Sequence, residues 1–536
     1  MLLNRVLVLC LALPAAMSLA RAQDAAPPQV QAGKAWEFSG DDGKTWAADP
    51  PAVPGGTLGV LLARASFDIA DPAAARFWAL SHALPPRMDL SYSLNGAEVA
   101  APLPGMYYRT IPAIPAARLR RGRNEVLARI RIDNRPPRRD PNRVMADVDL
   151  RPPRQLPTLT GQTLAFKTGP ILGAFEDDSF SVTIRTSVPA PVKLTATETD
   201  WVTNWRPARQ PVREVTSPAA LIHRFRVPKD AGACRVTYRL EAELGREKVA
   251  TATRAVSLPV FGYKARLDGE LRFVIMGDTR SRTDDWGRTA AAVLKEKPEF
   301  VVFMGDMNDH GTNDWEWDQH YLAPQSARDL LATIPLYTVP GNHEEGAPLY
   351  RELFQAPGLD DTWRAWAKEI GSVLIIGIDG QWHRAYKKTY QRIDETLAAS
   401  KAKFIFFVTH YPAYSSAGNG KLDSAGKPRH WSYQMGREVI LPMLRKHKAT
   451  AFFAAHEHHY ERSDIPGGPP QIIAGTAGAP RSGRSRDAKR QNPYAKVFAR
   501  SLNYCVIEVK GDTCKMTAKA PNGTVLDTLT WRARKP

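Results

Sequence analysis

The feature that most constrains the fold is a series of short apolar runs in the C-terminal half, most of which end at a polar side chain. These runs lie at 271–278, 299–306, 335–343, 372–379, 403–410 and 449–458. Near-continuous apolar runs of this kind are typical of strands that are buried on both faces. Segments with a helical pattern alternate with them at 284–297, 325–333, 390–400 and 434–447. The alternation predicts an α/β domain over residues 265–536.

The polar residues at the ends of these runs are of the types that bind metal ions. They are Asp278, Asp306, Asn342, His343, His410, His456 and His458. Loops that leave the carboxyl edge of an α/β sheet gather ligands, so we expect these side chains to converge. Ten of the twelve histidines follow residue 300, which indicates that this half uses imidazole. Mixed carboxylate, amide and imidazole donors suit Zn, Mn or Fe better than sites that prefer thiolates.

The N-terminal half has the pattern of all-β modules. Between residues 36 and 153, short apolar stretches are separated by Pro, Gly and Asn. The runs SYSLNGAEV (91–99) and LRRGRNEVLARIRI (119–132) resemble jelly-roll, carbohydrate-binding-like modules, which implies a fold and leaves a glycan or surface polymer as a possible partner. Residues 154–264 alternate with period two, as in a sandwich of the fibronectin type III or immunoglobulin kind. The chain is therefore predicted to be multidomain.

The first 22 residues have the pattern of a cleaved secretory signal. Arg5 precedes an apolar run that ends near Leu13, and the triplet 20–22 is Ala-Arg-Ala. A membrane anchor is the alternative, but the run is short against the ~20 residues that span a bilayer. We expect a secreted or periplasmic protein without a transmembrane segment after cleavage. Residues 23–35 are rich in Ala, Pro and Gln and are predicted to be a linker.

Charge and cysteine content narrow the class of ligand. The formal charge of +18 becomes +16 once Arg5 and Arg21 leave with the signal, which favours anionic ligands such as phosphates. No motif of a specific nucleic-acid-binding module is present. Three cysteines remain, Cys234, Cys505 and Cys514, and this odd number rules out a fully paired framework without an intermolecular bridge. A bridge between Cys505 and Cys514 is left open.

Five motifs in the predicted α/β domain resemble, in order, those of the calcineurin-like metallophosphoesterases. They are GDTR (277–280), GDMND (305–309), GNHE (341–344), VTHYP (408–412) and AHEHHYER (455–462). The extended last motif, after a β-sandwich module, resembles the purple acid phosphatase-like branch. The resemblance implies a four-layer α/β sandwich and an acid phosphatase-like hydrolase with two metal ions.

The resemblance also implies a role for each matching residue. Asp278, Asp306 and His458 would hold one ion, and Asp306, Asn342, His410 and His456 the other, so that Asp306 bridges them. A metal-activated hydroxide would attack the phosphate ester. His343 would be the general acid, oriented by Glu344, or would stabilise the leaving oxygen; the alternative is a simple hydrogen bond behind the ligands.

Two residues depart from the family pattern. Asp309 stands where purple enzymes have a tyrosine, so this protein should not be purple, and it either binds the first ion or makes a hydrogen bond nearby. Arg280 stands where the family has His or Gly, and it either binds substrate phosphate or anchors its loop. Tyr411 is a further candidate for substrate contact, as are Tyr414, His430 and the basic run 481–490.

These patterns favour an exported phosphomonoesterase. A phosphodiesterase or nucleotide-cleaving enzyme with the same ligands is the alternative within the class. The alternative outside it is a surface-binding protein with a degenerate phosphoesterase domain, against which the intact ligand set argues. A mononuclear peptidase would need a helical H-E-x-x-H motif, which the chain lacks.

Overall fold

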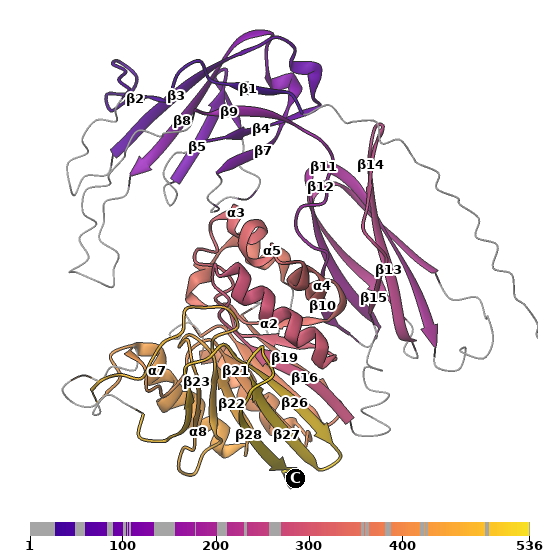
Figure 1. The fold of residues 1–536 in the computed structure, drawn as a ribbon, viewed down its shortest axis with the longest axis vertical. Coiled ribbons are helices and arrows are strands. Elements are labelled where there is room, and N and C mark those ends of the chain that lie inside the picture. The colour runs from indigo at the N-terminus through magenta and orange to yellow at the C-terminus, as the bar shows by residue number, and fades with distance from the viewer. Residues whose placement is uncertain are drawn as a thin grey trace, which may run out of the picture.

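The structure is a computed structural model, and three bodies follow one another along the chain (Figure 1). A first β module and a second β module precede an α/β domain, as expected from the sequence. The predicted signal, residues 1–22, lies outside the described residues. The structure describes residues 27–48, 59–82, 89–99, 103, 106, 109–132, 156–176, 178–200, 212–229, 233–256, 270–354, 359, 364–380, 387–418, 423, 427–487 and 492–534.

The first β module consists of two antiparallel sheets that pack around Trp36, Phe67 and Trp78. One sheet has the order β1 (Gln29–Gln31), β9 (Thr158–Gln162), β4 (Phe77–Ser81) and β7 (Thr110–Pro115). The other has the order β2 (Glu37–Ser39), β3 (Gly59–Ile69), β8 (Gly122–Ile132), β5 (Asp89–Leu94) and β6 (Ala97–Val99). Two short 3-10 turns, Pro72–Ala74 and Ala116–Arg118, complete the described part of this module.

Two predicted boundaries differ from the structure, both because of strand β9. The strand lies inside the predicted second domain, yet it pairs with β1 and β4 of the first module. Its Leu159 is fully buried opposite Val30 and Leu80, so the first core is complete only when the chain returns. Strand β1 lies inside the predicted linker 23–35. The first module therefore extends beyond the predicted 36–153 at both ends.

The second β module is one antiparallel six-stranded sheet built on the long strand β11 (Ser179–Asp200). A register shift between Arg185 and Ala190 bends β11, as bulges do. Alternate residues such as Val182 and Leu194 face the buried side, which follows the predicted period of two. The other strands are β10 (Ile171–Phe175), β12 (Val212–Pro228), β13 (Ala233–Leu244), β14 (Glu247–Ala250) and β15 (Arg254–Val256). The particular fold types of both β modules stay predictions.

The α/β domain has two sheets that pack face to face. The first has the order β18 (Leu336–Thr338), β17 (Val301–Phe303), β16 (Glu270–Met276), β26 (Tyr504–Lys510), β27 (Thr513–Lys519) and β28 (Val525–Arg532). The second has the order β19 (Ala365–Ile370), β20 (Val373–Ile378), β21 (Phe404–Thr409), β22 (Ala451–Ala454), β24 (Gln471–Ala474), β23 (Tyr460–Ser463) and β25 (Ala495–Ala499). Strands β18, β17 and β16 run parallel, as do β20, β21, β22 and β24.

Alternate side chains of these strands reach two different cores. Phe273 of β16 and Phe406 of β21 meet between the sheets, with ring centroids 5.7 Å apart. Their strand neighbours Val274 and Phe407 face outward, toward helices. This is why the runs are apolar at nearly every position.

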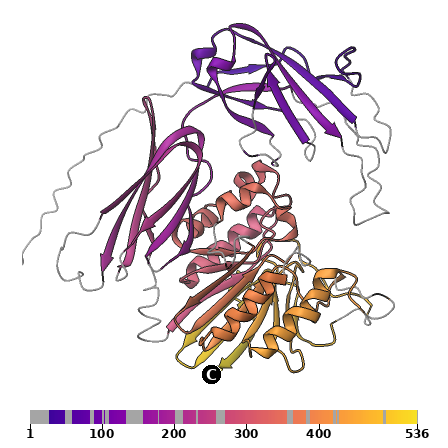
Figure 2. The same cartoon turned by 180° about the vertical axis from the view of Figure 1, so that it is seen from behind.

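Helices cover the outer face of each sheet, so the domain has four layers. Helices α2 (Thr283–Glu296), α4 (Gln325–Thr333) and α5 (Pro348–Leu353) pack on the first sheet. Helices α6 (Lys387–Ala399) and α8 (Leu441–Lys446) pack on the second, and the orange helices stand in front when the molecule is seen from behind (Figure 2). The helix expected at 434–447 is divided among α7 (Trp431–Met435), a π-helical turn (Gly436–Ile440) and α8. Pro442 lies in the first turn of α8, where its missing N–H is tolerated.

Cys505 and Cys514 are both buried free thiols. Cys505 faces Ala518 across the β26–β27 ladder, and Cys514 faces Val509, so the two are out of register. The possible bridge between them is absent. Among the described residues, no helix combines the length and the apolar character needed to cross a membrane.

Candidate metal centre

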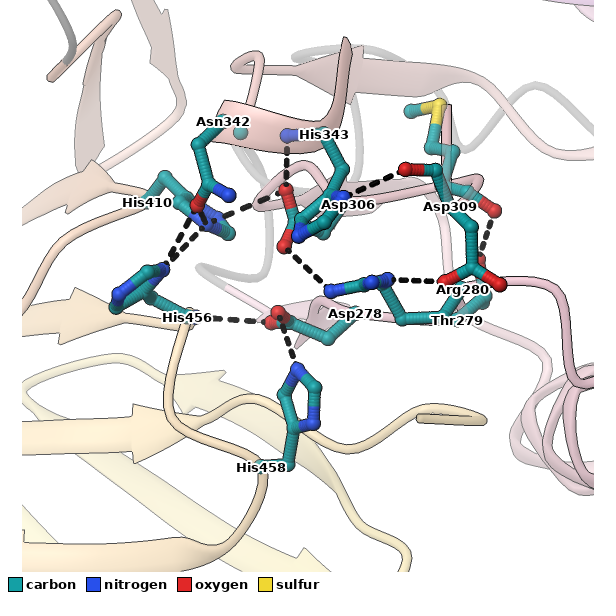
Figure 3. A network of polar contacts seen from close by, with 12 residues as sticks. Asp278, Thr279, Arg280, Asp306, Asp309, Asn342, His343, His410, His456 and His458 are labelled. Carbon is teal, nitrogen blue, oxygen red and sulfur yellow. Dashed lines mark hydrogen bonds and ion pairs between the residues drawn. The ribbon is translucent and has the colours of Figure 1, made fainter. Parts of the chain in front are cut away.

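The predicted metal-ligand residues lie in loops at the carboxyl ends of parallel strands from both sheets. Asp278 follows β16, Asp306 follows β17, and Asn342 opens the 3-10 turn Asn342–Glu344 after β18. His410 follows β21, and the segment with His456 and His458 joins β22 to β23. Figure 3 shows the side chains converging between the two sheet edges.

Two groups of potential ligand atoms share one carboxylate. The first group is Asp278, Asp306 and His458, and the second is Asp306, His410 and His456; within each group the ligand atoms lie within 4.8 Å of one another. Asn342 Oδ1 adds to the second group, 2.8 Å from His456 Nδ1 and 3.1 Å from His410 Nε2. This grouping coincides with the two ligand sets expected from the resemblance. The roles of these residues as ligands stay predictions.

Hydrogen bonds to main-chain carbonyls orient two of the imidazoles. His410 Nδ1 lies 2.7 Å from the Met304 carbonyl, and His458 Nδ1 lies 2.9 Å from the Pro480 carbonyl. When each Nδ1 donates its proton to a carbonyl, the lone pair of Nε2 is free to bind a metal ion, which is the arrangement of metal-binding histidines. Asp278 Oδ1 is buried and, within the described residues, makes no hydrogen bond, although His458 Nε2 lies 3.5 Å away. These donors fit divalent or trivalent ions.

The backbone of the site is strained where the ligands are. Asp278, Asp306 and His456 have φ values of +58°, +55° and +67°, a region that non-glycine residues seldom adopt. Such conformations persist where the surroundings enforce them, and they are common at functional sites. The strain supports the assignment of this cluster as the functional site.

Two glycines allow the second and third motif loops to touch. A Cβ on Gly305 would lie 2.1 Å from the nitrogen of Gly341, and a Cβ on Gly341 would lie 2.2 Å from Asp306 Oδ1. Any side chain at either position would push the loops apart. The sequence showed these glycines only as letters of the motifs, without this role.

The buried charges of the site depend on one another. Burial raises the pKa of Asp278. Burial also opposes ionisation of Asp306, but the charges of His410, His343 and Arg280 hold its pKa well below the usual value. Burial tends to lower the pKa of His410, yet Asp306 and Asp278 raise it to about 9. The carboxylates thus attract positive charge, which bound cations would supply.

The hydrogen bonds that hold His343 beside the cluster do not involve the side chain of Glu344. The N–H of His343 donates to Asp306 Oδ1 at 2.9 Å, and its Nδ1 lies 2.6 Å from the Asp309 carbonyl. Glu344 accepts instead from the N–H groups of Asp306 and Met307 and of its own loop, at 2.5–2.9 Å. Burial and the charge of Asp306 raise the pKa of Glu344 to about 7. The prediction that Glu344 orients His343 is therefore wrong.

Arg280 and Asp309, the two residues that depart from the family pattern, contact each other. Arg280 Nε donates to Asp309 Oδ1 at 2.7 Å, and Arg280 NH1 lies 3.7 Å from Asp306 Oδ2 (Figure 3). Asp309 therefore makes the hydrogen bond nearby, one of its two predicted roles. Sequence reasoning treated the two residues separately, although their opposite charges in adjacent motifs were a signal of pairing.

The other predicted contact residues are only partly near the cluster. The Tyr411 ring lies 4.6 Å from that of His456, and the His430 ring lies 5.2 Å from that of Tyr411. Tyr414 contacts Arg437 and Tyr494 instead. The basic run approaches through Ser482, whose N–H donates to the His458 carbonyl at 2.7 Å. Residues 488–490 of that run lie outside the described residues.

Comparison with known proteins agrees with this geometry. The model of the calcineurin-like phosphoesterase family matches residues 271–460. A probable glycerophosphodiester phosphodiesterase, GpdQ, of Arcobacter nitrofigilis is 27% identical over 176 residues, which are 31% of this chain and 58% of that relative. The chain thus aligns with little more than half the length of this curated relative.

Two solved structures share the fold at low identity. Purple acid phosphatase PPD1 from yellow lupin (Lupinus luteus) seeds has a TM-score of 0.57 and 15% identity, over 90% of this chain and 94% of that one. PhoD has a TM-score of 0.52 and 13% identity, over 69% of this chain and 90% of that one. The match to the calcineurin-like phosphoesterase model thus lies within the α/β domain, and the two solved structures show that the fold is shared.

Proposed function

We propose that this chain is a phosphoesterase that depends on two metal ions and prefers phosphomonoesters as substrates. The observation that carries the proposal is the carboxylate of Asp306, which belongs to both groups of potential ligands. A shared carboxylate is what a pair of adjacent cations requires. The match of residues 271–460 to the calcineurin-like phosphoesterase model supports the reaction class.

The ions would be Fe, Zn or Mn. Asp278, Asp306 and His458 would hold one, and Asp306 with Asn342, His410 and His456 the other. When bound, such a pair acts as a Lewis acid and supplies hydroxide near neutral pH. The tyrosine of the purple enzymes is replaced by Asp309, so no tyrosinate colour is expected.

His343 and Arg280 are the residues proposed to act on the substrate. His343 Nδ1 is engaged by the Asp309 carbonyl, which leaves Nε2 to give a proton to the leaving oxygen. Arg280 uses Nε on Asp309, which leaves its terminal nitrogens on the side of Asp306 for a phosphate oxygen. Tyr411, 4.6 Å from the His456 ring, would border the leaving group.

A phosphodiesterase is the second candidate. The relative named as a glycerophosphodiester phosphodiesterase favours it, although the match covers 31% of this chain. The same ligands serve both reactions, which differ in how the surrounding loops receive the second ester group. A non-catalytic, surface-binding role is disfavoured because every expected ligand type is in place.

Export and a partner for the first β module belong to the same proposal. The N-terminal pattern of residues 1–22 supports passage to the periplasm or the exterior. A glycan or surface polymer is the partner proposed for the first module, although the resemblance of its runs 91–99 and 119–132 to carbohydrate-binding-like modules implies only a fold. Amino-terminal sequencing of the mature protein tests the first point, because an intact Met1 would contradict cleavage.

The experiment for the activity combines elemental analysis with two substrates. The purified protein is assayed with p-nitrophenyl phosphate and bis-p-nitrophenyl phosphate from about pH 4 to about pH 10. Two ions per chain and faster monoester hydrolysis are expected. Faster diester hydrolysis would favour the second candidate, and a folded protein that no added metal activates would overturn the proposal.

A further inference from the structure

Helix α3 (Asp314–Glu316) is three residues long, and each residue contacts a different part of the molecule. Asp314 contacts the second β module, Trp315 contacts the first, and Glu316 contacts two loops of the metal centre. We propose that Glu316 is a positioning residue that fixes Arg280 toward the substrate phosphate, and that the β modules hold Glu316 in place through α3. This inference rests on the role proposed for Arg280.

Glu316 holds both loops from which the Arg280–Asp309 pair projects. Its Oε2 accepts from the N–H groups of Asp309 and His310, each at 3.0 Å, and from Ser281 Oγ at 3.1 Å. Ser281 follows Arg280 directly, so one carboxylate oxygen joins the first motif loop to the second. Glu316 is 2% exposed, so these bonds have little competition from water.

A shielded ion pair between Arg185 and Asp314 joins the second β module to the start of α3. Arg185 of β11 donates to Asp314 Oδ1 at 2.7 Å, and the two side chains are 9% and 16% exposed. Its other terminal nitrogen lies 3.9 Å from Asp318, which also bonds Thr168. Removing one partner of a shielded ion pair strongly destabilises a protein, because the other charge stays buried without a partner. The position of α3 therefore depends on the second module.

The first β module adds a weaker contact. The Arg109 guanidinium lies 3.8 Å from the centre of the Trp315 ring, a cation–π geometry. Contacts of this kind are worth less than a shielded ion pair, so the first module should matter less than the second.

Helix α3 has little stability of its own to set its position. It forms a single turn without a side-chain cap at its N-terminus, and it continues directly into the π-helical turn Trp317–Tyr321, in which Trp317 and Tyr321 are fully buried. Short helices are marginal without tertiary contacts. The position of the Glu316 carboxylate is then set from two sides, by this buried turn and by the contacts of Asp314 and Trp315 with the β modules.

A double-mutant cycle on the full chain tests the first link. Glu316→Gln keeps the shape and removes the charge, and kcat and KM for p-nitrophenyl phosphate are measured in the wild-type and Arg280→Ala backgrounds. We expect Glu316→Gln to lower kcat/KM roughly tenfold in the wild type, because small displacements of a binding group are costly, and less than twofold with Arg280→Ala. Equal losses in both backgrounds, or no loss in either, would overturn the inference.

A second arm tests the link to the β modules and is available if Glu316→Gln does not fold. Asp314→Asn weakens the pair with Arg185, and Arg254→Ala is the matched control, since it removes another inter-domain pair, Arg254–Asp329 at 2.8 Å, on α4. We expect a loss of several-fold in kcat/KM for Asp314→Asn that disappears with Arg280→Ala, and no change for Arg254→Ala. Equal effects of the two variants would overturn this link. An inactive wild type would instead contradict the proposed function itself.

Discussion

The inner half of the metal centre, formed by Asn342, His410 and His456 around Asp306, keeps the family residues, and its His410 is fully buried, whereas Asn342 and His456 are partly buried. The His410 side chain has no solvent exposure, and its ring lies 5.1 Å from that of His456. In the outer half, Asp278 is also fully buried, whereas the side chains of His458, Arg280 and Asp309 are 17%, 18% and 44% exposed. Both departures from the family pattern lie in this outer half.

The difference shows where the site tolerates change. The inner half is closely packed, since a Cβ on Gly341 would lie only 2.7 Å from the His410 ring. The Arg280–Asp309 pair of the outer half is partly exposed, so two opposite charges replace other residues there without leaving a charge buried and unpaired. We therefore expect the inner half to govern assembly of the centre and the outer half to govern substrate contact.

The largest effect is expected from Asp306→Asn, which affects both halves at once. Loss of the shared charge should lower metal content below two ions per chain and reduce kcat by roughly 1000-fold or more, since metal ions supply several kcal/mol of transition-state stabilisation. Elemental analysis and p-nitrophenyl phosphate turnover measure both. Asp309→Asn is the control and should keep two ions. Near-normal turnover of Asp306→Asn would contradict the dinuclear assignment.

His410→Ala and His458→Ala separate the halves directly. Each should leave about one ion per chain, but only His410→Ala should also destabilise the fold, by about 1–3 kcal/mol, because it leaves a cavity and a buried, unpaired Met304 carbonyl, whereas water can reach the Pro480 carbonyl that His458→Ala leaves. Denaturant unfolding with elemental analysis tests this. Equal stability of the two variants would contradict the distinction between the fully buried His410 and the partly exposed His458.

His343→Ala should affect chemistry without affecting metal binding. Loss of a general acid costs roughly 100-fold or more, and the cost is greatest for substrates whose leaving groups need a proton. The variant should therefore keep two ions and slow alkyl phosphates more than p-nitrophenyl phosphate. Equal slowing of both substrates would indicate that His343 only supports the ligands.

The smallest effect is expected in the way that the stability contributed by Glu316 depends on pH. Burial tends to raise its pKa, but hydrogen bonds from His320, Asn313 and the loops lower it from 4.5 to about 2. A lowered folded-state pKa gives stability that is present above about pH 4.5 and is lost as the pH falls toward 2. Glu316→Gln should therefore cost about 3 kcal/mol at pH 7 and little near pH 2. A cost independent of pH would contradict the assignment.

Much of the α/β domain could be predicted because its signals are local. Each apolar run became a buried strand, and helix α4 spans the expected residues 325–333. Donor residues at strand ends converge because parallel strands share an edge, so their grouping followed from topology.

The remaining features depend on contacts between distant segments, which residue types do not reveal. Glu344 and Glu316 both act on main-chain N–H groups of other loops, and any residue except proline supplies such a group. Strands β1 and β9 are three and five residues long, too short for a periodicity to separate them from loops. Local sequence patterns do not reveal that these two strands pair with each other across the module.

That pairing affects the order in which the protein can fold. Gln29 of β1 is bonded in register to Thr160 of β9, so the first sheet joins the two ends of its own module. During synthesis or export the chain emerges amino terminus first, and domains tend to fold as they emerge. The first module must wait for its last strand, with β4 exposed along the edge that β9 later covers. We expect a chaperone to be most needed in that interval.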